Sequence, residues 1–281
     1  MASPPILFKR IKHTVALPLS LIYNQFMSVA YVPDTWKMAV ITPVYKKGAI
    51  TDCCNYRPIS VACVMSKIFE RVVCREVHQH LSCNDILYPA QHGFLKGRST
   101  CTDLLESLND WTLSPQDRHG VVIVYIDFSK NLMWSHIRHY LPDYTPMAYR
   151  VTCYCGYAIF SQAELTTKVR NNLSEFLVLI SGVVQGSVIG PLTFLMYINE
   201  LISILERYGI IVKMFADDVK LYLRIINDVD VCMLERALTA LAQWALDWQL
   251  TISVEKCCVL HLGNVNKSLK LSVNGSSHSQ L

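Results

Sequence analysis

Apolar residues recur along this chain in two distinct spacings, one typical of helices and one typical of strands. Apolar positions three or four residues apart predict helices over residues 14–30, 64–81, 101–111, 191–207 and 231–250. Short apolar runs predict strands over residues 39–44, 121–126 and 256–260, and alternation around a turn predicts a hairpin over residues 212–223. The mixture of helices and strands indicates an α/β class.

One predicted strand, residues 121–126, is apolar throughout and ends directly before Asp127. Continuous apolar runs of this length are typical of strands buried on both faces. Ligands of α/β sheets gather at strand ends, so Asp127 is a candidate binding residue. An Asp at this place also serves as a turn or helix-capping residue, and on its own evidence Asp127 fits both interpretations.

The predicted hairpin carries two adjacent carboxylates, Asp217 and Asp218, at its tip. Neighbouring anions repel each other, and a divalent cation would relieve that repulsion. Mg²⁺ prefers one or two carboxylates together with substrate phosphates, so the pair suggests phosphoryl transfer. If the strands before Asp127 and around Asp217 lie side by side, both carboxylates could bind shared ions, as in two-metal sites. A solvated turn is the alternative for the isolated pair.

A third candidate segment runs from Ser181 to Pro191 and contains three glycines and Gln185. Glycines allow a backbone to approach a ligand closely, and Gln185 offers both a donor and an acceptor to a base or phosphate. Pro191 lies where helices favour proline, just inside the first turn. A strand-to-helix turn without a ligand explains the same pattern.

Charge is distributed unevenly along the 281 residues, although the net charge is only +4. Residues 1–100 hold 12 Lys and Arg against 5 Asp and Glu, whereas residues 101–281 hold 14 against 17. A basic first part suits a polyanionic partner, and a more acidic remainder suits cations. Apolar residues make up 52% of the chain, which excludes global disorder.

The 11 cysteines form no pair of C-x₂-C units and are odd in number, so we expect a reducing compartment and no disulfide framework. No apolar run reaches the roughly 20 residues of a membrane helix, and no membrane contact is expected. The polar residues Asn24 and Gln25 argue against a signal peptide near the start. We therefore expect an intracellular protein, in cytoplasm and nucleus, that is not secreted.

Six motifs occur in an order that resembles the reverse transcriptase domain of non-LTR (LINE-type, jockey-like) retrotransposons. They are Asn55-Tyr56-Arg57-Pro58-Ile59-Ser60, Gln91-His92-Gly93-Phe94, Tyr125-Ile126-Asp127-Phe128-Ser129-Lys130, Ser181 to Pro191, Phe215-Ala216-Asp217-Asp218, and Trp248-Gln249-Leu250 with Lys256-Cys257. Each motif is weak to moderate alone, but six in one order are highly specific. The resemblance runs from about Pro33 to about Asn274.

The resemblance implies an α/β (α+β) right-hand polymerase fold. Its palm would be a ferredoxin-like antiparallel sheet backed by helices. Fingers are expected over residues 1–115, a palm over residues 116–275 and a frayed tail over residues 276–281. The thumb is expected to be absent, and the thumb and endonuclease would normally be on the same longer chain.

The resemblance also implies roles for individual residues. Asp127, Asp217 and Asp218 resemble the family's catalytic metal ligands, for Mg²⁺ or Mn²⁺, and Lys256 resembles the lysine proposed to protonate pyrophosphate. The implied nucleotide-binding residues are Lys47, Arg57, Leu132 and Gln185. The implied template–primer residues are Gln91, Gly93, Phe94 and Gly186. The implied partners are an RNA template, a DNA primer and dNTPs.

Two departures from the family pattern bear on activity. The family continues its first aspartate motif with Ala-Phe-Asp, where this chain has Asn131-Leu132-Met133. Leu132 therefore replaces the aromatic that screens the sugar 2′ position, and Val184 replaces a proline before Gln185. Together with the expected absence of a thumb, which should make the template–primer duplex dissociate faster, these changes predict weak or absent activity, as in a truncated or decayed copy.

Three functions compete at this point. The first is an RNA-directed DNA polymerase domain, which the three intact carboxylates favour. The second is a catalytically inactive retroelement remnant that acts at most as a nucleic-acid-binding protein. The third is a metal-dependent nuclease or nucleotide cyclase, which the ordered motifs around Arg57 and Gln91 disfavour.

Overall fold

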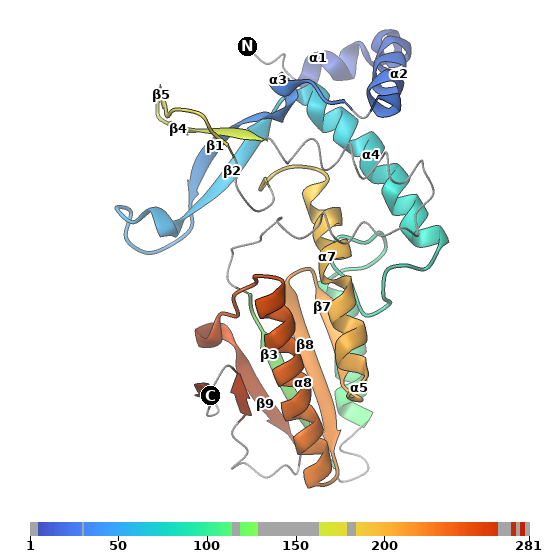
Figure 1. The fold of residues 1–281 in the computed structure, drawn as a ribbon, viewed down its shortest axis with the longest axis vertical. Coiled ribbons are helices and arrows are strands. Elements are labelled where there is room, and N and C mark those ends of the chain that lie inside the picture. Colours follow the sequence, from blue (N-terminus) through green and yellow to red (C-terminus); the bar gives the residue numbers. More distant parts are fainter. Residues whose placement is uncertain are drawn as a thin grey trace. The chain divides into compact units, whose positions relative to one another are not determined.

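The computed structural model describes residues 5–29, 31–113, 119–128, 163–178, 184–263, 271–273 and 276–278 (Figure 1). The chain divides into two compact units. The first holds Met1–Asn84 and Trp134–Leu192, and the second holds Asp85–Met133 and Thr193–Leu281. The boundary after Asn84 differs from the division at 115/116 that the sequence predicts.

The difference arises from helix α5, Thr100–Leu113, which the sequence pattern places in the first part. Asp103 on this helix forms a buried ion pair with Lys220, a residue of strand β8 in the second unit. Ser107 also accepts a hydrogen bond from Lys220. These contacts attach α5 to the second unit.

The first unit is built around a β-hairpin. Strands β1, Met38–Tyr45, and β2, Tyr56–Ala62, pair antiparallel with Ala39 opposite Ala62. Strand β4, Glu164–Val169, pairs parallel with β1, and the short strands β5, Asn172–Leu173, and β6, Leu177–Val178, pair with β4. Strand β2 was not predicted, and its Pro58 breaks the apolar pattern.

Four helices are described near the start of the first unit, and aromatic side chains of the last three pack together. The helices are α1, Pro5–Arg10; α2, Lys12–Ser28; α3, Asp34–Lys37; and α4, Val64–Cys83. Tyr23 of α2 packs against Trp36 of α3 and Phe69 of α4, with ring centroids 5.9 and 5.1 Å away. The predicted helices at residues 14–30 and 64–81 correspond to α2 and α4.

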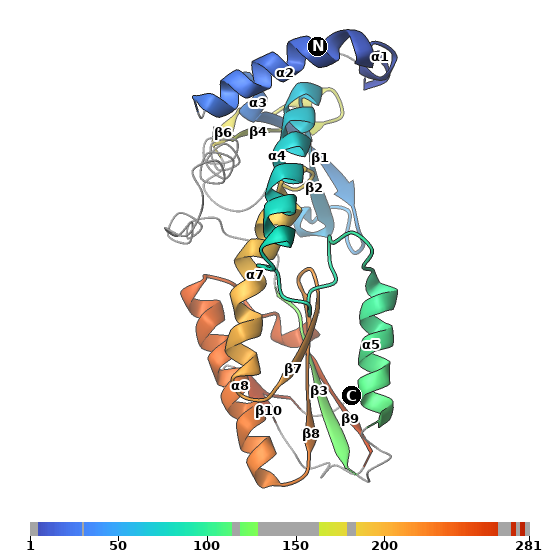
Figure 2. The ribbon, with the colours of Figure 1, turned by 90° about the vertical axis from the view of Figure 1, so that its right-hand side faces the viewer.

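The second unit contains a four-stranded antiparallel sheet in the order β7-β8-β3-β9. Its strands are β3, Gly120–Ile126; β7, Ile211–Phe215; β8, Asp218–Ile225; and β9, Cys258–Leu262. Helices α7, Gly190–Glu206, and α8, Asp228–Asp247, lie on one face, and α5 lies on the other (Figure 2). The short strands β10, Leu271–Val273, and β11, Ser276–His278, pair with each other.

Strand β3 lies in the interior of this sheet, between β8 and β9. Val121 to Val124 and Ile126 are at most 2% exposed, as the continuous apolar run predicts. Val121 and Ile123 pack with Trp111 of α5 and Tyr222 of β8. The predicted hairpin over residues 212–223 is confirmed as β7 and β8.

Helix α8 begins and ends earlier than the predicted 231–250. Asn227 starts it in a capping box, because its side chain accepts from Val229 N and its own N–H donates to Asp230. Gln249, at φ +56°, takes a left-handed conformation just beyond the helix.

Nine cysteines are described, and all nine are free thiols. Among the described helices, none is both long and apolar enough to span a membrane.

Candidate active site

The two adjacent carboxylates lie at the tight turn between β7 and β8. Phe215 pairs with Asp218, so Ala216 and Asp217 form a two-residue turn. Ala216 has φ +57°, a left-handed conformation that glycine usually adopts in such turns. The turn leaves the Asp217 side chain exposed, while Ala216 is buried.

The pairing of β3 with β8 brings Asp127 to the same end of the sheet. Ile126 pairs with Val219, so the next residue, Asp127, lies beside the start of β8 at Asp218. Partial burial raises the pKa of Asp218, and the negative charges of Asp217 and Asp127 raise it further. The negative charges of Asp217 and Asp127 are therefore both near enough to act on Asp218.

The chemistry of this acidic site fits a divalent cation. Its ligand atoms are hard carboxylate oxygens, and their mutual repulsion favours a bound cation. The ligand oxygens of the three carboxylates do not all lie within 4.8 Å of one another. Mg²⁺ does not require that, because it is typically held by one or two carboxylates with water and substrate phosphates. Asp127, Asp217 and Asp218 are the carboxylates at this end of the sheet that could hold such a cation.

Lys256 lies against one of these carboxylates, Asp127. It ends the short 3₁₀ helix η4, Val254–Lys256, and its Nζ donates to Asp127 Oδ1 across 3.0 Å. The segment is tied down because Ser253 N donates to the Asp127 carbonyl oxygen at 2.8 Å. The Lys256 side chain is 53% exposed and the Asp127 side chain 35%. A charge-assisted contact of this kind places the predicted lysine beside a predicted metal ligand.

Gln91 and Gly93, expected at the template–primer, lie against the acidic turn. Gln91 is 2% exposed, and its Oε1 accepts hydrogen bonds from Gly93 N at 2.7 Å and Ala216 N at 3.0 Å. Phe94 has φ +57° and is 55% exposed. Within this motif, Phe94 therefore presents the most accessible side chain.

The nucleotide-binding candidates that the structure describes belong to the first unit. Lys47 follows β1 and Arg57 lies on β2, and both are exposed. Gln185 is exposed at its side chain, and its carbonyl oxygen accepts from Ser60 N at 2.8 Å. Leu132 lies outside the described residues.

Gly186 follows Gln185 at a place where a side chain does not fit. Its φ is +105°, and a Cβ would lie 2.7 Å from the carbonyl oxygen of Ser60. Glycine is thus required for the close approach of this loop to β2. This packing gives Gly186 a structural role in addition to the implied contact with template–primer.

Glu70, which was not predicted from the sequence, supports the same loop. Glu70 of α4 is 1% exposed, and its Oε2 accepts from Val188 N at 2.6 Å and Ile189 N at 3.3 Å. Burial raises the pKa of its carboxyl, against the effect of these hydrogen bonds. The sequence did contain a signal for this buried glutamate. Glu70 lies one turn after Ser66 and directly after Phe69, on the side of α4 that the apolar stripe predicts to be buried.

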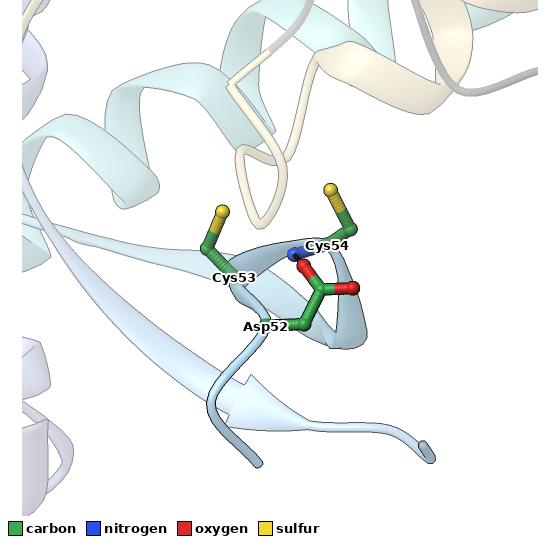
Figure 3. A group of neighbouring side chains, drawn as sticks. All are labelled: Asp52, Cys53 and Cys54. Carbon is green, nitrogen blue, oxygen red and sulfur yellow. Dashed lines mark hydrogen bonds between the residues drawn. The ribbon is translucent and has the colours of Figure 1, made fainter. Parts of the chain in front are cut away.

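One further cluster of possible metal ligands occurs among the described residues, at Asp52, Cys53 and Cys54 (Figure 3). All three are exposed, and their ligand atoms lie within 4.8 Å of one another. Asp52 Oδ1 accepts from Cys54 N at 2.9 Å and caps a 3₁₀ helix, η1, Cys53–Asn55. A side-chain hydrogen bond with Asp52, more than any other effect, raises the pKa of the Cys54 thiol, which disfavours the thiolate that a metal needs.

Comparison with known proteins identifies the family of the chain. The model of the family "Reverse transcriptase (RNA-dependent DNA polymerase)" matches residues 44–277. A probable RNA-directed DNA polymerase from transposon BS of Drosophila melanogaster is 28% identical over 258 residues, 85% of this chain and 27% of that protein. The RNA-directed DNA polymerase from mobile element jockey, of the same species, is 25% identical over 92% of this chain and 29% of its own length.

Solved structures show the same fold at low sequence identity. Apo telomerase from Candida tropicalis, truncated from the C-terminal domain, matches with a TM-score of 0.55 and 11% identity, over 94% of this chain and 58% of that one. Telomerase from Candida albicans, with a fragment of telomeric RNA, matches with a TM-score of 0.53 and 12% identity, over 92% of this chain and 48% of its own.

Proposed function

Because the chain belongs to the reverse transcriptase (RNA-dependent DNA polymerase) family, we propose that it extends a DNA primer on an RNA template by two-metal nucleotidyl transfer. Its relatives are the polymerases of jockey, BS and X-element retrotransposons. The chain spans less than a third of the length of these relatives. Any endonuclease or thumb that serves this site is therefore proposed to lie on a longer chain.

The pairing of β3 with β8 supports the proposal most directly. It carries Asp127 to the end of the sheet where the β7–β8 turn holds Asp217 and Asp218. Under this proposal Asp127 and Asp217 bind Mg²⁺ or Mn²⁺, with Asp218 adjacent. Bound cations of this kind lower the pKa of a primer hydroxyl and neutralise a triphosphate. Lys256, an ammonium beside Asp127, is suited to donate a proton to pyrophosphate as it leaves.

The implied nucleotide-binding residues are proposed to contact the incoming dNTP. The guanidinium of Arg57 suits two-point recognition of a phosphate, and the ammonium of Lys47 suits a point contact. Gln185 would lie over the nascent base pair, with its backbone held by Ser60. Leu132 would flank the sugar, and its side chain is smaller than an aromatic. We therefore propose reduced discrimination against ribonucleotides.

The template–primer would be contacted by Phe94 and by the segment around Gly186. The exposed aromatic ring of Phe94 is suited to stack on an unpaired base. Phosphate and shape contacts are expected to dominate, because sequence is read by template pairing.

A nucleic-acid-binding remnant without catalysis is the second candidate, and specific residues favour it. Val184 and Leu132 replace residues that shape the nucleotide side of the family's site. If they abolish catalysis, nucleic acid binding could persist without primer extension.

Primer extension with matched aspartate variants tests the proposal. Purified protein receives a primed RNA template, dNTPs and Mg²⁺ or Mn²⁺. Asp217→Asn removes a charge at the proposed metal site, whereas Asp228→Asn removes one beyond the opposite end of β8. Extension should fall at least about a hundredfold in Asp217→Asn and persist in Asp228→Asn.

The other outcomes are equally informative. Extension that survives Asp217→Asn would refute catalysis at this site. No extension by the unchanged protein, combined with measurable binding of the primed template, would favour the non-catalytic remnant.

A further inference from the structure

The acidic turn adopts a conformation that its own sequence does not favour. A two-residue hairpin turn with a left-handed first position is usually occupied by glycine or asparagine there. This chain has Ala216 at φ +57°. Because alanine resists the left-handed region, contacts from outside the hairpin must help to hold the turn.

Gln91 supplies such a contact. Its Oε1 accepts from the backbone N–H of Ala216 at 3.0 Å and from that of Gly93 at 2.7 Å. Both partners are donors, so the atom that faces them must be the amide oxygen and not the nitrogen. The Nε2 atom is buried without a hydrogen-bond partner among the described residues, so the side chain is engaged through its oxygen.

The backbone around Gln91 is also fixed to strand β7. Met214 N donates to Ala90 O at 2.9 Å, and His92 N donates to Met214 O at 2.7 Å. Gln91 thereby forms a parallel bridge with Met214. Arg98 Nη1 donates to Gln91 O at 3.0 Å and also to Pro89 O. Gln91 is therefore held on both sides, and its oxygen is presented in a fixed position.

Gly93 completes the contact with the turn. A Cβ at this position would lie 2.2 Å from Ala216 N and 2.8 Å from Ala216 Cα. Both atoms belong to the backbone, so the overlap could be relieved only by moving the turn and the segment around position 93 apart. The glycine at position 93 thus sets how closely residues 91–93 approach the residue before Asp217.

We infer that Gln91 and Gly93 are positioning residues that hold Ala216 in its left-handed conformation and so place Asp217 for cation binding. The inference rests on the proposed metal site and assigns Gln91 a role other than contact with template. A neutral amide suits this place, because it provides the acceptor oxygen without a fourth negative charge near Asp127, Asp217 and Asp218.

Four variants separate this role from general stability. Gln91→Met removes the acceptor, and Gln91→Glu retains an acceptor oxygen. Gly93→Ala introduces the Cβ that the turn cannot accommodate. Lys96→Ala alters a residue on the same loop and serves as the control.

Two measurements that need no polymerase activity report on the turn. Hydrogen exchange at the Ala216 amide should be at least about tenfold faster in Gln91→Met, because a buried donor loses its acceptor. Mn²⁺ affinity, measured by titration with paramagnetic detection, should fall at least about tenfold in Gln91→Met and Gly93→Ala. In Gln91→Glu, which keeps an acceptor oxygen, the exchange rate of the Ala216 amide should stay within about threefold of the rate in the unchanged protein.

Unchanged exchange at Ala216 and unchanged Mn²⁺ affinity in Gln91→Met and Gly93→Ala, both folded by circular dichroism, would overturn the inference. If Gln91→Met fails to fold, the exchange rate and Mn²⁺ affinity of Gly93→Ala still decide the inference. Where extension is detectable, kcat should fall in Gln91→Met while the KM for dNTP stays within about twofold. A protein that lacks extension but loses Mn²⁺ affinity in these variants would contradict the proposed catalysis and leave the positioning role supported.

Discussion

The ammonium of Lys256 donates a hydrogen bond to Asp127 Oδ1 across 3.0 Å. The two residues are 129 positions apart, and the contact forms because β9 pairs antiparallel with β3, with Cys258 opposite Tyr125, so that η4 lies beside Asp127. Lys256 therefore neutralises a carboxylate that the proposed function assigns to a metal. A cation that binds Asp127 must compete with this ammonium or share the carboxylate with it.

Removal of Lys256 should strengthen cation binding. We expect Lys256→Ala to raise Mn²⁺ affinity by about two- to fivefold, because a half-exposed ion pair is worth up to about 1 kcal/mol. Extension, where detectable, should fall. Arg236→Ala, which removes an exposed positive charge from α8, is the control and should leave affinity unchanged. Weaker Mn²⁺ binding in Lys256→Ala would contradict the competition.

The buried ion pair between Asp103 and Lys220 should be essential for stability. Their atoms are 2.6 Å apart, and the side chains are 7% and 10% exposed. Asp103→Ala leaves a buried ammonium without its carboxylate, so unfolding should be easier by about 3–5 kcal/mol. Urea titration followed by circular dichroism and tryptophan fluorescence measures this, and Trp111, whose ring centroid lies 5.9 Å from Lys220 Nζ, is one of the five tryptophans that contribute to the signal.

Two further variants test whether charge or packing matters at this pair. Asp103→Leu combined with Lys220→Met should recover most of the lost stability, because two apolar groups replace two desolvated charges. Asp247→Ala removes an exposed carboxylate from α8 and should change stability by less than about 0.5 kcal/mol. A loss below about 1 kcal/mol in Asp103→Ala would show that the pair is not effectively buried.

Gly186→Ala should destabilise the first unit more than an equivalent change at Gly48. Both glycines have positive φ, +105° and +93°. A Cβ at Gly186 meets the backbone oxygen of Ser60, whereas one at Gly48 meets the movable side chain of Asn55. Thermal unfolding should show an extra cost of about 1–3 kcal/mol for Gly186→Ala. Equal costs at the two positions would refute the proposed clash.

Glu70 should make stability depend on pH. Burial raises the pKa of its carboxyl above the ordinary 4.5, so the folded state favours the protonated form. Its stabilising contribution is then fully present below about pH 4.5 and is lost as pH rises through the raised pKa. Relative to Glu70→Gln, the unchanged protein should lose stability between about pH 4 and pH 7.

Unfolding midpoints of the two proteins across that range measure the effect. The exposed Glu164, changed to Gln, provides a control whose difference from the unchanged protein should not vary in the same way. A difference between the protein and Glu70→Gln that is constant with pH, or a relative stability of the unchanged protein that rises with pH, would contradict the raised pKa.

Local pattern alone predicted much of the fold. The apolar run before Asp127 predicted β3, and alternation around Asp217 predicted the hairpin, because burial and strand geometry act within a few residues. Strand β2 was missed because Pro58 interrupts its pattern. Helix α5 was predicted, but the pattern did not show which of its residues would be buried. Asp103 is 5% exposed, whereas the apolar Leu105 is 67% exposed. Asp103 is buried because it faces Lys220, a partner far away in the sequence.

The candidate site shows the same division. Residue types and motif order by themselves predicted the family, which the comparisons confirm, and identified Asp127, Asp217 and Asp218 as candidate metal ligands. Only the tertiary structure decided that Gln91 supports the acidic turn and that Lys256 contacts Asp127. The physical reason is the distance along the sequence over which each interaction acts. Hydrophobic spacing and backbone preference are properties of short segments, whereas a hydrogen bond from Ala216 N to Gln91, 125 positions apart, exists only once the chain has folded.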